Sequence, residues 1–252
     1  MYTLKSDRLT VQVAEPNKED LTCRFDRAGF ITSVVLDGQY EFCSEEGGGS
    51  FGKGLCSEIQ CDPLSNEVAV GDTFFKFGVG ILTKTEEHPY MILNQYPCED
   101  FEVTADAKDD CIVFRTEPKD CKGYAAAEQK TLLVKGNVIT MDYELTNAGS
   151  KEFTFTEYVH NFVAPNHHGM DGTFNQFAID HGDSYEWKMI CGGEDLCFRE
   201  VDRFIPSHTN FWTCLSAICP ELFFKASLKP GETAKWTREW HFENHGEWTW
   251  NL

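Results

Sequence analysis

One histidine lies at the end of a strand-like run of hydroxylated residues, where an imidazole could do acid–base chemistry. The run FTFTEYVH spans residues 153–160, and successive side chains of an extended strand point to opposite faces. His160 therefore shares a polar face with Tyr158 and two threonines, whereas Glu157 lies on the opposite, apolar face. Because an imidazole changes its protonation near neutral pH, we expect His160 to project from an open face into a cavity as an acid or base. The alternative is a histidine that anchors a loop through hydrogen bonds.

The elements that carry this histidine are predicted to be antiparallel β-strands. Short runs rich in β-branched and aromatic residues alternate with Gly, Pro, Asn and Asp, which is typical of strands joined by tight turns. The runs expected to be strands are residues 29–36, 111–115, 131–134, 138–145 and 153–160. No segment keeps a helical apolar stripe over three turns. The pattern predicts an all-β fold with little helix, a sandwich of antiparallel sheets that forms a single domain over residues 1–252.

The composition of the chain limits its partners. Of its 252 residues, 41% are hydrophobic and 13% aromatic, which is enough for a sizeable core. Its 22 basic and 41 acidic residues give a net charge of −19, which repels nucleic-acid phosphates and anionic lipid surfaces. We therefore expect no nucleic acid and no membrane among its partners, and a neutral ligand. The amino-terminal sequence has no apolar signal segment and no apolar stretch is long enough to span a bilayer, which predicts a cytoplasmic protein.

Eleven cysteines could indicate metal binding or disulfides, but their spacing favours neither. No Cys-x-x-Cys pair is present, and the closest pairs, Cys56/Cys61 and Cys214/Cys219, are spaced too widely for a usual zinc site. An odd number of cysteines in a chain of this length also makes a poor disulfide scaffold. We expect the cysteines to be reduced, small buried hydrophobes, and no metal to be bound.

Several segments follow one another as they do in a known enzyme family. Residues 123–162 (GYAAAEQKTLLVKGNVITMDYELTNAGSKEFTFTEYVHNF) resemble the middle of the aldose 1-epimerases, the galactose mutarotases. Residues 228–232 (LKPGE) and 236–242 (WTREWHF) are similar to the family's closing turn and last strand, and residues 51–58 (FGKGLCSE) look like the region that presents a sugar-binding arginine. The resemblance covers most of the chain and is that of a divergent member. It implies a large antiparallel β-sandwich, the supersandwich.

The resemblance assigns roles to residues, with departures from the family pattern. His160 matches the histidine that acts as general acid toward the sugar ring oxygen. Lys53 stands where the family has arginine, and lysine lacks the planar fork for a bidentate sugar contact. The family's His-Gly-Gly element falls near residues 77–80 (FGVG) without its first histidine. Lys76 or His88 could stand in for it, although a surface loop explains His88 better.

Three glutamates are candidates for the general base. The family's Glu-x-Gln motif is missing, and Glu221 is the only carboxylate between Phe211 and Leu228, so we expect Glu221 to be the base. Glu58 and Glu157 remain alternatives. A solvated turn residue after a proline explains Glu221 equally well.

The implied chemistry is the opening and closing of a sugar ring. Opening a pyranose removes the O1 proton while the ring oxygen receives one, and each such proton transfer contributes about 10²–10⁴-fold. A carboxylate roughly 6–7 Å from the imidazole would leave room for the ring between two hydrogen-bonding groups, and no cofactor is needed. Hydrogen bonds to hydroxyls and aromatic stacking would hold the sugar. The candidates for this binding are Lys53, Lys76, Tyr158, Asn161, Asn166, His167, His168 and Trp212.

The resemblance therefore implies a mutarotase-like isomerase that acts on an aldose or on a sugar at a glycan end. The departures at Lys53, at the missing histidine and at the missing Glu-x-Gln motif favour an alternative, a carbohydrate-binding protein that kept the fold and lost turnover. A lyase or epimerase of modified sugars on the same scaffold is a third hypothesis.

Overall fold

The structure is a computed structural model that describes residues 1–18, 22–46, 52–61, 64–165, 174–191, 195–214 and 216–244. Its strands are β1 (Tyr2–Lys5), β2 (Leu9–Val13), β3 (Ile31–Leu36), β4 (Tyr40–Glu41), β5 (Leu55–Gln60), β6 (Thr73–Lys76), β7 (Gly80–Thr83), β8 (Cys98–Asp100), β9 (Val103–Ala107), β10 (Cys111–Thr116), β11 (Ala126–Lys135), β12 (Val138–Asn147), β13 (Phe153–Asn161), β14 (Phe174–Asp180), β15 (Tyr185–Cys191), β16 (Leu196–Asp202), β17 (His208–Thr213), β18 (Ile218–Leu228) and β19 (Thr233–Glu243). One short 3-10 helix, η1, covers Leu64–Glu67. Within the described ranges, no helix has the length and apolarity that crossing a bilayer requires.

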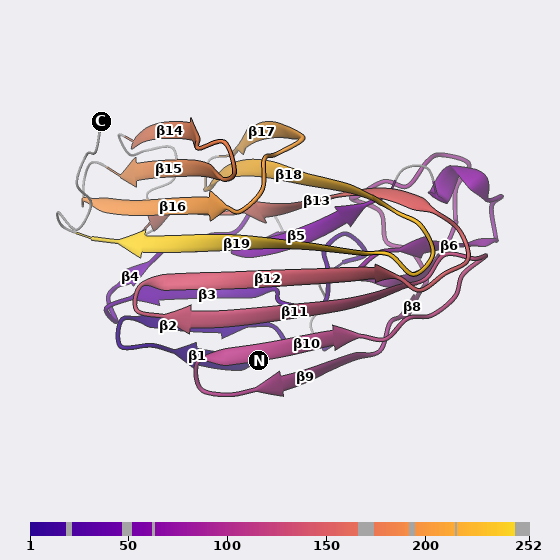
Figure 1. The fold of residues 1–252 in the computed structure, drawn as a ribbon, viewed down its shortest axis with the longest axis horizontal. Helices are drawn as coiled ribbons and strands as arrows, with labels where there is room; N and C mark the ends of the chain where they lie inside the picture. The colour runs from indigo at the N-terminus through magenta and orange to yellow at the C-terminus, as the bar shows by residue number, and fades with distance from the viewer. Residues whose placement is uncertain are drawn as a thin grey trace.

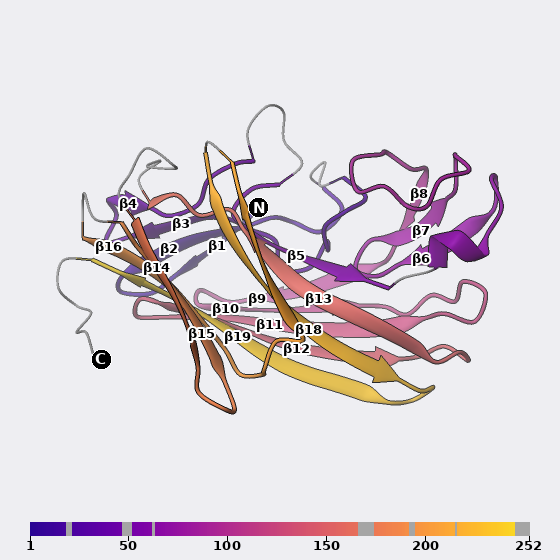
Figure 2. The ribbon, with the colours of Figure 1, turned by 90° about the horizontal axis from the view of Figure 1, so that it is seen from above.

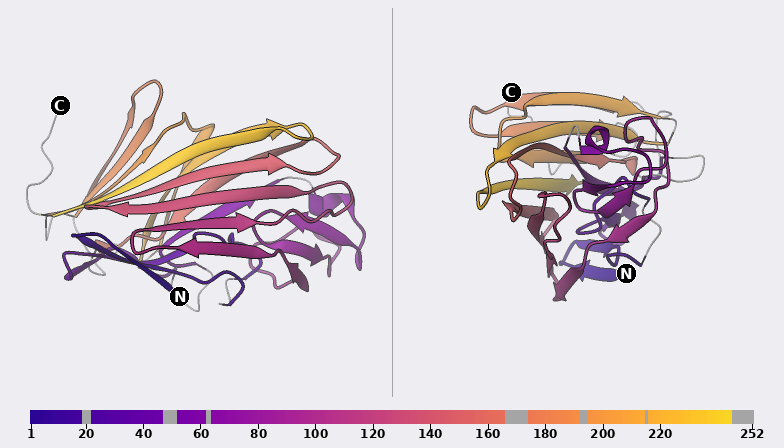
Figure 3. Two further views of the ribbon diagram at one scale, coloured as in Figure 1. Left: turned by 60° about the horizontal axis from the view of Figure 1, so that its bottom comes forward. Right: turned by 90° about the vertical axis from the view of Figure 1, so that its right-hand side faces the viewer.

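Two large antiparallel sheets form the body of the molecule. The first has the strand order β1-β2-β3-β5-β13-β18-β17 with β4 beside β3, and the second has the order β14-β15-β16-β19-β12-β11-β10-β9. Figure 1 looks onto the second sheet, and Figure 2 shows β5, β13 and β18 side by side in the first. A third sheet, β6-β7-β8, lies with η1 at one end of the sandwich, the end that faces the viewer in the right panel of Figure 3. The prediction of large antiparallel sheets with little helix is confirmed.

The side-chain alternation of the central strands builds the core between the sheets. In β12, Ile139, Met141, Tyr143 and Leu145 are buried, whereas Asp142 is exposed. β12 pairs with β11 on one side and β19 on the other, and its apolar face packs in one core cluster with residues of the first sheet. This is the pattern that the sequence predicts for a half-buried strand.

The turn after β3 shows how local sequence closes these hairpins. Asp37 and Gly38 both adopt positive φ, 52° and 68°, in the connection between β3 and β4. The Gln39 amide donates to the Leu36 carbonyl at 3.0 Å and closes a four-residue turn, whose two central residues need positive φ, which Asp and Gly tolerate best. The chain therefore reverses here at little conformational cost.

Charged side chains are also buried between the two sheets. Glu157 of β13 accepts hydrogen bonds from Arg238 Nη2 at 2.7 Å and from the Trp236 indole at 3.0 Å. Arg238 Nη1 also donates to Asp202 at 2.8 Å and to Glu200 at 3.2 Å, and all four charged residues are fully buried. Glu157 thus belongs to an internal ion-pair network that ties β13 to β16 and β19, on the face where the alternation places it.

Residues 22–30 run along the edge of β5 and cover part of the outer face of the first sheet. The Asp26 amide donates to the Ser57 carbonyl at 2.9 Å. Phe25 and Phe30 pack with Phe162 in a small apolar cluster separate from the main core. At Gly78, between β6 and β7, φ is +68° and an added Cβ would lie 2.4 Å from the Asp26 carboxyl, so only glycine lets this turn approach the segment.

Candidate functional site

The candidate site lies on the outer face of β5, β13 and β18, opposite the core. In the pairing of β13 with β5, Tyr158 stands directly beside Glu58. His160 follows Tyr158 by two residues and so shares its face, and Glu221 of the neighbouring strand β18 reaches the imidazole. Three adjacent strands therefore present two carboxylates, a phenol and an imidazole within one small area.

His160 and Glu221 are in direct contact. His160 Nε2 lies 3.2 Å from Glu221 Oε1, and the two side chains are only 2% and 6% exposed. The Asn210 amide, from the paired edge strand β17, donates to the other carboxyl oxygen at 2.7 Å. Glu221 is thus a buried strand residue rather than a solvated turn residue, and Asn210 fixes the direction in which its carboxyl points.

The surroundings of the imidazole correct the expectation of an open, hydroxyl-lined face. The His160 ring stacks on Phe162 at a centroid distance of 4.0 Å, and the Trp212 ring lies edge-on at 5.1 Å. Phe25 lies at 6.4 Å from the same ring. The hydroxyl row holds only at the other end of β13, because near His160 the face is covered by residues 22–30 and by Trp212 of β17. The carboxylate at 3.2 Å likewise leaves no room for a sugar ring, in contrast to the expected separation.

One ring atom of His160 remains unsatisfied within the described part of the chain. His160 Nδ1 is buried and has no hydrogen-bond partner among the described residues. Buried polar atoms are nearly always paired, so an exception calls for an explanation such as a missing ligand or water. The contact with Glu221 uses Nε2, which leaves Nδ1 as the atom with spare hydrogen-bonding capacity.

Burial shifts the pKa values of His160 and Glu221 in opposite directions. Desolvation, helped by the positive charge of Arg24, lowers the pKa of His160 to about 3. Desolvation raises the pKa of Glu221, although the hydrogen bond from Asn210 and the charge of Arg24 act in the other direction. Both shifts favour uncharged forms, so the imidazole is neutral at neutral pH and the carboxyl holds a proton more strongly than usual.

A second polar cluster adjoins this pair and is centred on Glu58. Arg24 Nε donates to Glu58 at 2.9 Å and Arg24 Nη2 to the Tyr158 hydroxyl at 2.9 Å, while that hydroxyl donates to Glu58 at 2.6 Å. Lys76 Nζ donates to Glu58 at 3.2 Å and to the Ile59 carbonyl at 3.0 Å. Burial opposes ionisation of Glu58, but Lys76, Arg24 and Tyr158 outweigh it and lower its pKa to about 2. Glu58 is therefore a fixed anion and a poor proton carrier.

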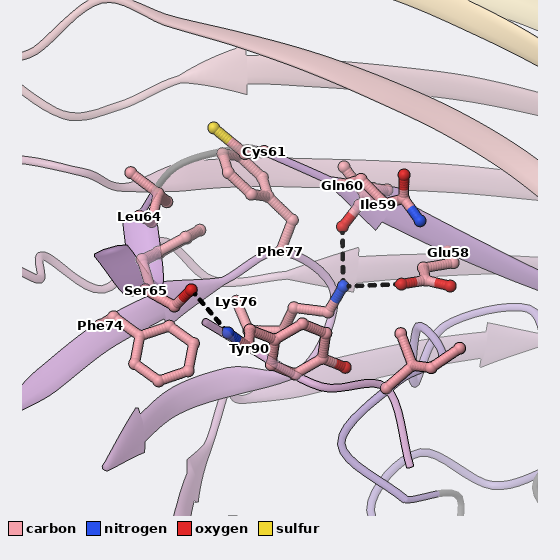
Figure 4. Close-up of a pocket in the computed structure, with 12 residues that line it drawn as sticks. Glu58, Ile59, Gln60, Cys61, Leu64, Ser65, Phe74, Lys76, Phe77 and Tyr90 are labelled. Atoms are coloured by element: carbon pink, nitrogen blue, oxygen red, sulfur yellow. Dashed lines mark hydrogen bonds and ion pairs between the residues drawn. The ribbon is translucent and has the colours of Figure 1, made fainter. Parts of the chain in front are cut away.

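A cavity of about 170 Å³ opens beside Lys76 (Figure 4). Its polar lining includes Glu58 and Lys76, and its aromatic lining includes Phe74 and Tyr90. Figure 4 shows the Lys76 ammonium reaching Glu58, with the Tyr90 ring alongside, 4.9 Å from Nζ at its centroid. Pockets for drug-sized ligands measure about 300–1,000 Å³, so this one suits a small ligand. Neither His160 nor Glu221 is among its lining residues.

Other residues expected at the site are placed elsewhere. Asn161 points into the sandwich, where its amide donates to Glu200 at 2.7 Å and to the Pro220 carbonyl at 3.1 Å. Lys53 lines a different hollow, next to β3 and β4. His88 is exposed in the segment between β7 and β8. Asn166, His167 and His168 lie outside the described residues.

No pattern in the sequence indicates two residues that organise the site, Arg24 and Asn210. Arg24 lies outside any strand and reaches Glu58 and Tyr158 across large sequence separations. Asn210 lies on an edge strand whose pattern is mostly exposed. The described residues hold no group of three or more His, Cys, Asp or Glu side chains arranged to bind a metal ion.

Trp212 covers the His160 imidazole, which predicts that the pKa of His160 changes when Trp212 is replaced. Replacing it with alanine exposes the imidazole to water, which relieves the desolvation and should raise the pKa of His160 from about 3 by roughly one unit or more. The titration is followed by NMR of histidine labelled in the ring. Phe211→Ala is the matched control, because Phe211 packs toward Trp187. An unchanged His160 titration in Trp212→Ala would refute the covering role.

Comparisons with known proteins agree on the architecture. No protein-family model matches the chain, and no curated protein matches it by sequence. Three similar solved structures are a galactose mutarotase-related enzyme from Lactobacillus acidophilus (12% identity, 98% of each chain covered, TM-score 0.63), a galactose mutarotase-like protein from Lactobacillus casei ATCC 334 (12%, 96% of this chain and 100% of that chain, 0.61) and a protein from Synechocystis sp. PCC 6803 (12%, 97% and 96%, 0.62). The chain therefore has the galactose mutarotase-like fold, of which it is a divergent example.

Proposed function

We propose that this protein is a mutarotase-like isomerase that interconverts the anomers of a neutral aldose, with His160 and Glu221 as its acid–base pair. The observation that carries the proposal is the 3.2 Å contact between an imidazole and a carboxyl on the outer face of a galactose mutarotase-like sheet. A neutral substrate fits the net charge of −19. It also fits the commitment of Arg24 and Lys76 to Glu58, which leaves these two cations poorly suited to a phosphate.

The pair can move the two protons that ring opening requires. One group takes the O1 proton while the other protonates the ring oxygen, and the roles reverse when the ring closes. Burial makes the imidazole neutral and raises the pKa of the carboxyl, so His160 is the better proton acceptor and Glu221 the better donor in the closed site. This reverses the roles expected from the family resemblance, but the pair carries one proton in either case.

Sugar binding requires the pair to separate. Because Nε2 and Oε1 already lie at hydrogen-bond distance, a pyranose ring can contact both groups only after the Glu221 carboxyl turns away from the imidazole. Asn210 holds this carboxyl from the edge strand β17, and Trp212 of the same strand covers His160. A displacement of β17 would therefore release the carboxyl and uncover the imidazole together.

The singly protonated pair predicts an acid-shifted pH profile. Below about pH 3 the imidazole gains a second proton for the pair, and above the raised pKa of Glu221 the pair loses its only proton. The rate of anomer exchange above the buffer rate should therefore fall on both sides. NMR exchange rates measured from pH 3 to pH 9 test the fall on the alkaline side. A rate that keeps rising toward alkaline pH would contradict the role of the shared proton.

The activity itself is tested with the wild-type protein and a panel of neutral aldoses. We expect exchange between the α and β anomers of at least one of them to exceed the buffer rate, as measured by NMR exchange spectroscopy. A hexose 6-phosphate in the same panel should be a poorer substrate. Buffer rates for every sugar tested would reject the proposal for those sugars.

A second candidate is a carbohydrate-binding protein without turnover. It is favoured by the burial of His160 and by the cavity beside Lys76, which includes neither member of the acid–base pair. Saturation-transfer NMR that detects sugar binding, together with anomer exchange at the buffer rate, would select it. Lys76→Met should then abolish binding, whereas His160→Gln should leave binding unchanged.

A further inference from the structure

A buried lysine of the second sheet holds the 22–30 segment from inside the sandwich. Lys130 of β11 is 1% exposed, and its Nζ donates to the Asp26 carboxyl at 2.8 Å and to the Ala28 carbonyl at 3.2 Å. Asp26 is equally buried, and its second carboxyl oxygen accepts the Ala28 amide at 2.7 Å. The segment lies close against the strand, since an added Cβ at Gly29 would be 3.5 Å from Lys130 Cδ. One ammonium therefore fixes two residues of the segment.

The same segment carries two residues of the candidate site. Arg24 Nε donates to Glu58 at 2.9 Å, and the Phe25 ring lies 6.4 Å from the His160 ring between centroids. Asp26, which the lysine holds, directly follows them in the chain. A displacement of Asp26 would therefore move the cation that binds Glu58 and the ring that covers His160.

A second carboxyl lies close to the Lys130 ammonium. Glu128 precedes Lys130 by two residues on β11 and shares its face, with Oε1 3.6 Å from Nζ. Both carboxyl oxygens of Glu128 are buried and have no hydrogen-bond partner among the described residues. Its neighbours on the adjacent strands are Thr116 and Leu145, which carry no charge. Two carboxyls thus lie near one ammonium in the interior.

The charges of this group balance when one of the two carboxyls carries a proton. An unpaired charge in the interior is strongly unfavourable. Asp26 accepts hydrogen bonds from Lys130 and from a backbone amide, whereas Glu128 accepts none, so the proton belongs on Glu128. Burial raises the pKa of Glu128 well above its usual value, and the charge of Asp26 acts in the same direction, against the effect of Lys130.

The other groups that interact electrostatically with Glu128 are paired or neutral. They are Glu157 of β13 and the Tyr143 phenol of β12. Glu157 is paired with Arg238 of β19 at 2.7 Å. Burial raises the pKa of Tyr143, and its ring centroid lies 5.0 Å from Lys130 Nζ. Lys130 is therefore the cation that an ionised Glu128 would attract.

We propose that Lys130 is a positioning residue for the candidate site, and that it holds the 22–30 segment in place while Glu128 carries a proton. When Glu128 ionises, its carboxylate competes with Asp26 for the ammonium, and the hydrogen bonds that fix the segment weaken. Displacement of the segment hydrates Glu128, so opening of the segment releases one proton. The proposal rests on the site of the proposed function, but its test measures the backbone and not turnover, so each can fail without the other.

Amide hydrogen exchange of the full chain from pH 5 to pH 8 tests the proposal. After correction for the intrinsic pH dependence of exchange, protection of the Asp26 and Ala28 amides should fall by up to about tenfold per pH unit, because opening releases one proton. In Glu128→Gln the corrected protection should not change with pH, since glutamine stays neutral. A wild type without pH dependence, or an equal fall in Glu128→Gln, would overturn the proposal.

A lysine variant separates positioning from general stability. Lys130→Met should lose protection in the 22–30 segment while amides of the β12–β19 ladder keep theirs. The matched control is Lys135→Met, at the exposed end of the same strand, which should behave as the wild type. An equal loss of protection in the ladder would show that Lys130 serves general stability, and would overturn the positioning role. If Lys130→Met does not fold, the comparison with Glu128→Gln decides.

The titration of His160 connects the segment to the site. Lys130→Met should raise the pKa of His160 from about 3, because burial and the charge of Arg24 both lower it in the wild type and both depend on the 22–30 segment. NMR of histidine labelled in the ring follows this titration. A wild-type His160 titration in a Lys130→Met variant that has lost protection of the segment would contradict the positioning role.

Discussion

Replacing His160 with glutamine is expected to lower the enzyme-dependent rate of anomer exchange by about 10²–10⁴-fold, the usual contribution of a positioned acid–base group. Glutamine can keep a hydrogen bond to Glu221 and fills a similar volume beside Phe162 and Trp212. It cannot exchange protons near neutral pH. The variant should therefore keep its fold while it loses the chemistry. NMR exchange spectroscopy gives the rate, and thermal unfolding gives the stability.

The same substitution at His88 provides the control for this prediction. His88 is exposed between β7 and β8, so His88→Gln should retain the wild-type rate. Should His160→Gln keep a rate within a few-fold of the wild type, His160 would be a structural residue that holds Glu221 and nothing more. If His160→Gln loses both rate and stability, the anomer-exchange rate of Glu221→Gln decides whether the pair takes part in the reaction.

Replacing Arg238 with methionine is expected to destabilise the fold strongly. Arg238 is fully buried and contacts the carboxyls of Glu157, Glu200 and Asp202. Desolvation already raises the pKa of Glu200 to about 7 and that of Asp202 above its usual value, with Arg238 opposing both shifts. Removing one partner of a buried ion pair costs about 3–5 kcal/mol. Urea unfolding followed by tryptophan fluorescence measures the loss.

Lys235→Met is the matched control for the arginine variant. Lys235 lies on the same strand, β19, but its ion pair with Glu144 is largely exposed, and exposed pairs contribute at most about 1 kcal/mol. If Arg238→Met does not fold, Arg238→Lys keeps the charge and tests the same network at a smaller cost. Equal stability losses for the Arg238 and Lys235 variants would show that the internal network contributes little.

The architecture could be predicted because alternation along a strand is a local property. The apolar residues of β12 and the opposite faces of Glu157 and His160 in β13 follow from the period of two alone. The same rule, applied one residue further, places Asn161 on the face of Glu157, where the structure has it. Asn161 was a sugar-binding candidate only because it neighbours His160 in sequence.

The surroundings of the site could not be predicted, because they depend on contacts between distant segments. Whether the outer face of β13 is open or covered is decided by residues 22–30 and by Trp212 of β17. Arg24 reaches Tyr158 across 134 positions, and nothing in its neighbouring sequence marks it as part of a site. The contact between His160 and Glu221 likewise depends on the pairing of β13 with β18, which alternation within each strand does not specify.

A double-mutant cycle in anomer exchange tests the central claim most directly. Rates are measured for the wild type, His160→Gln, Glu221→Gln and the double variant under identical conditions. Groups that act as one unit are strongly non-additive, so we expect the wild type to exceed the buffer rate and the double variant to be no slower than either single variant. Single variants that match the wild type, or losses that multiply in the double variant, would contradict the paired acid–base role.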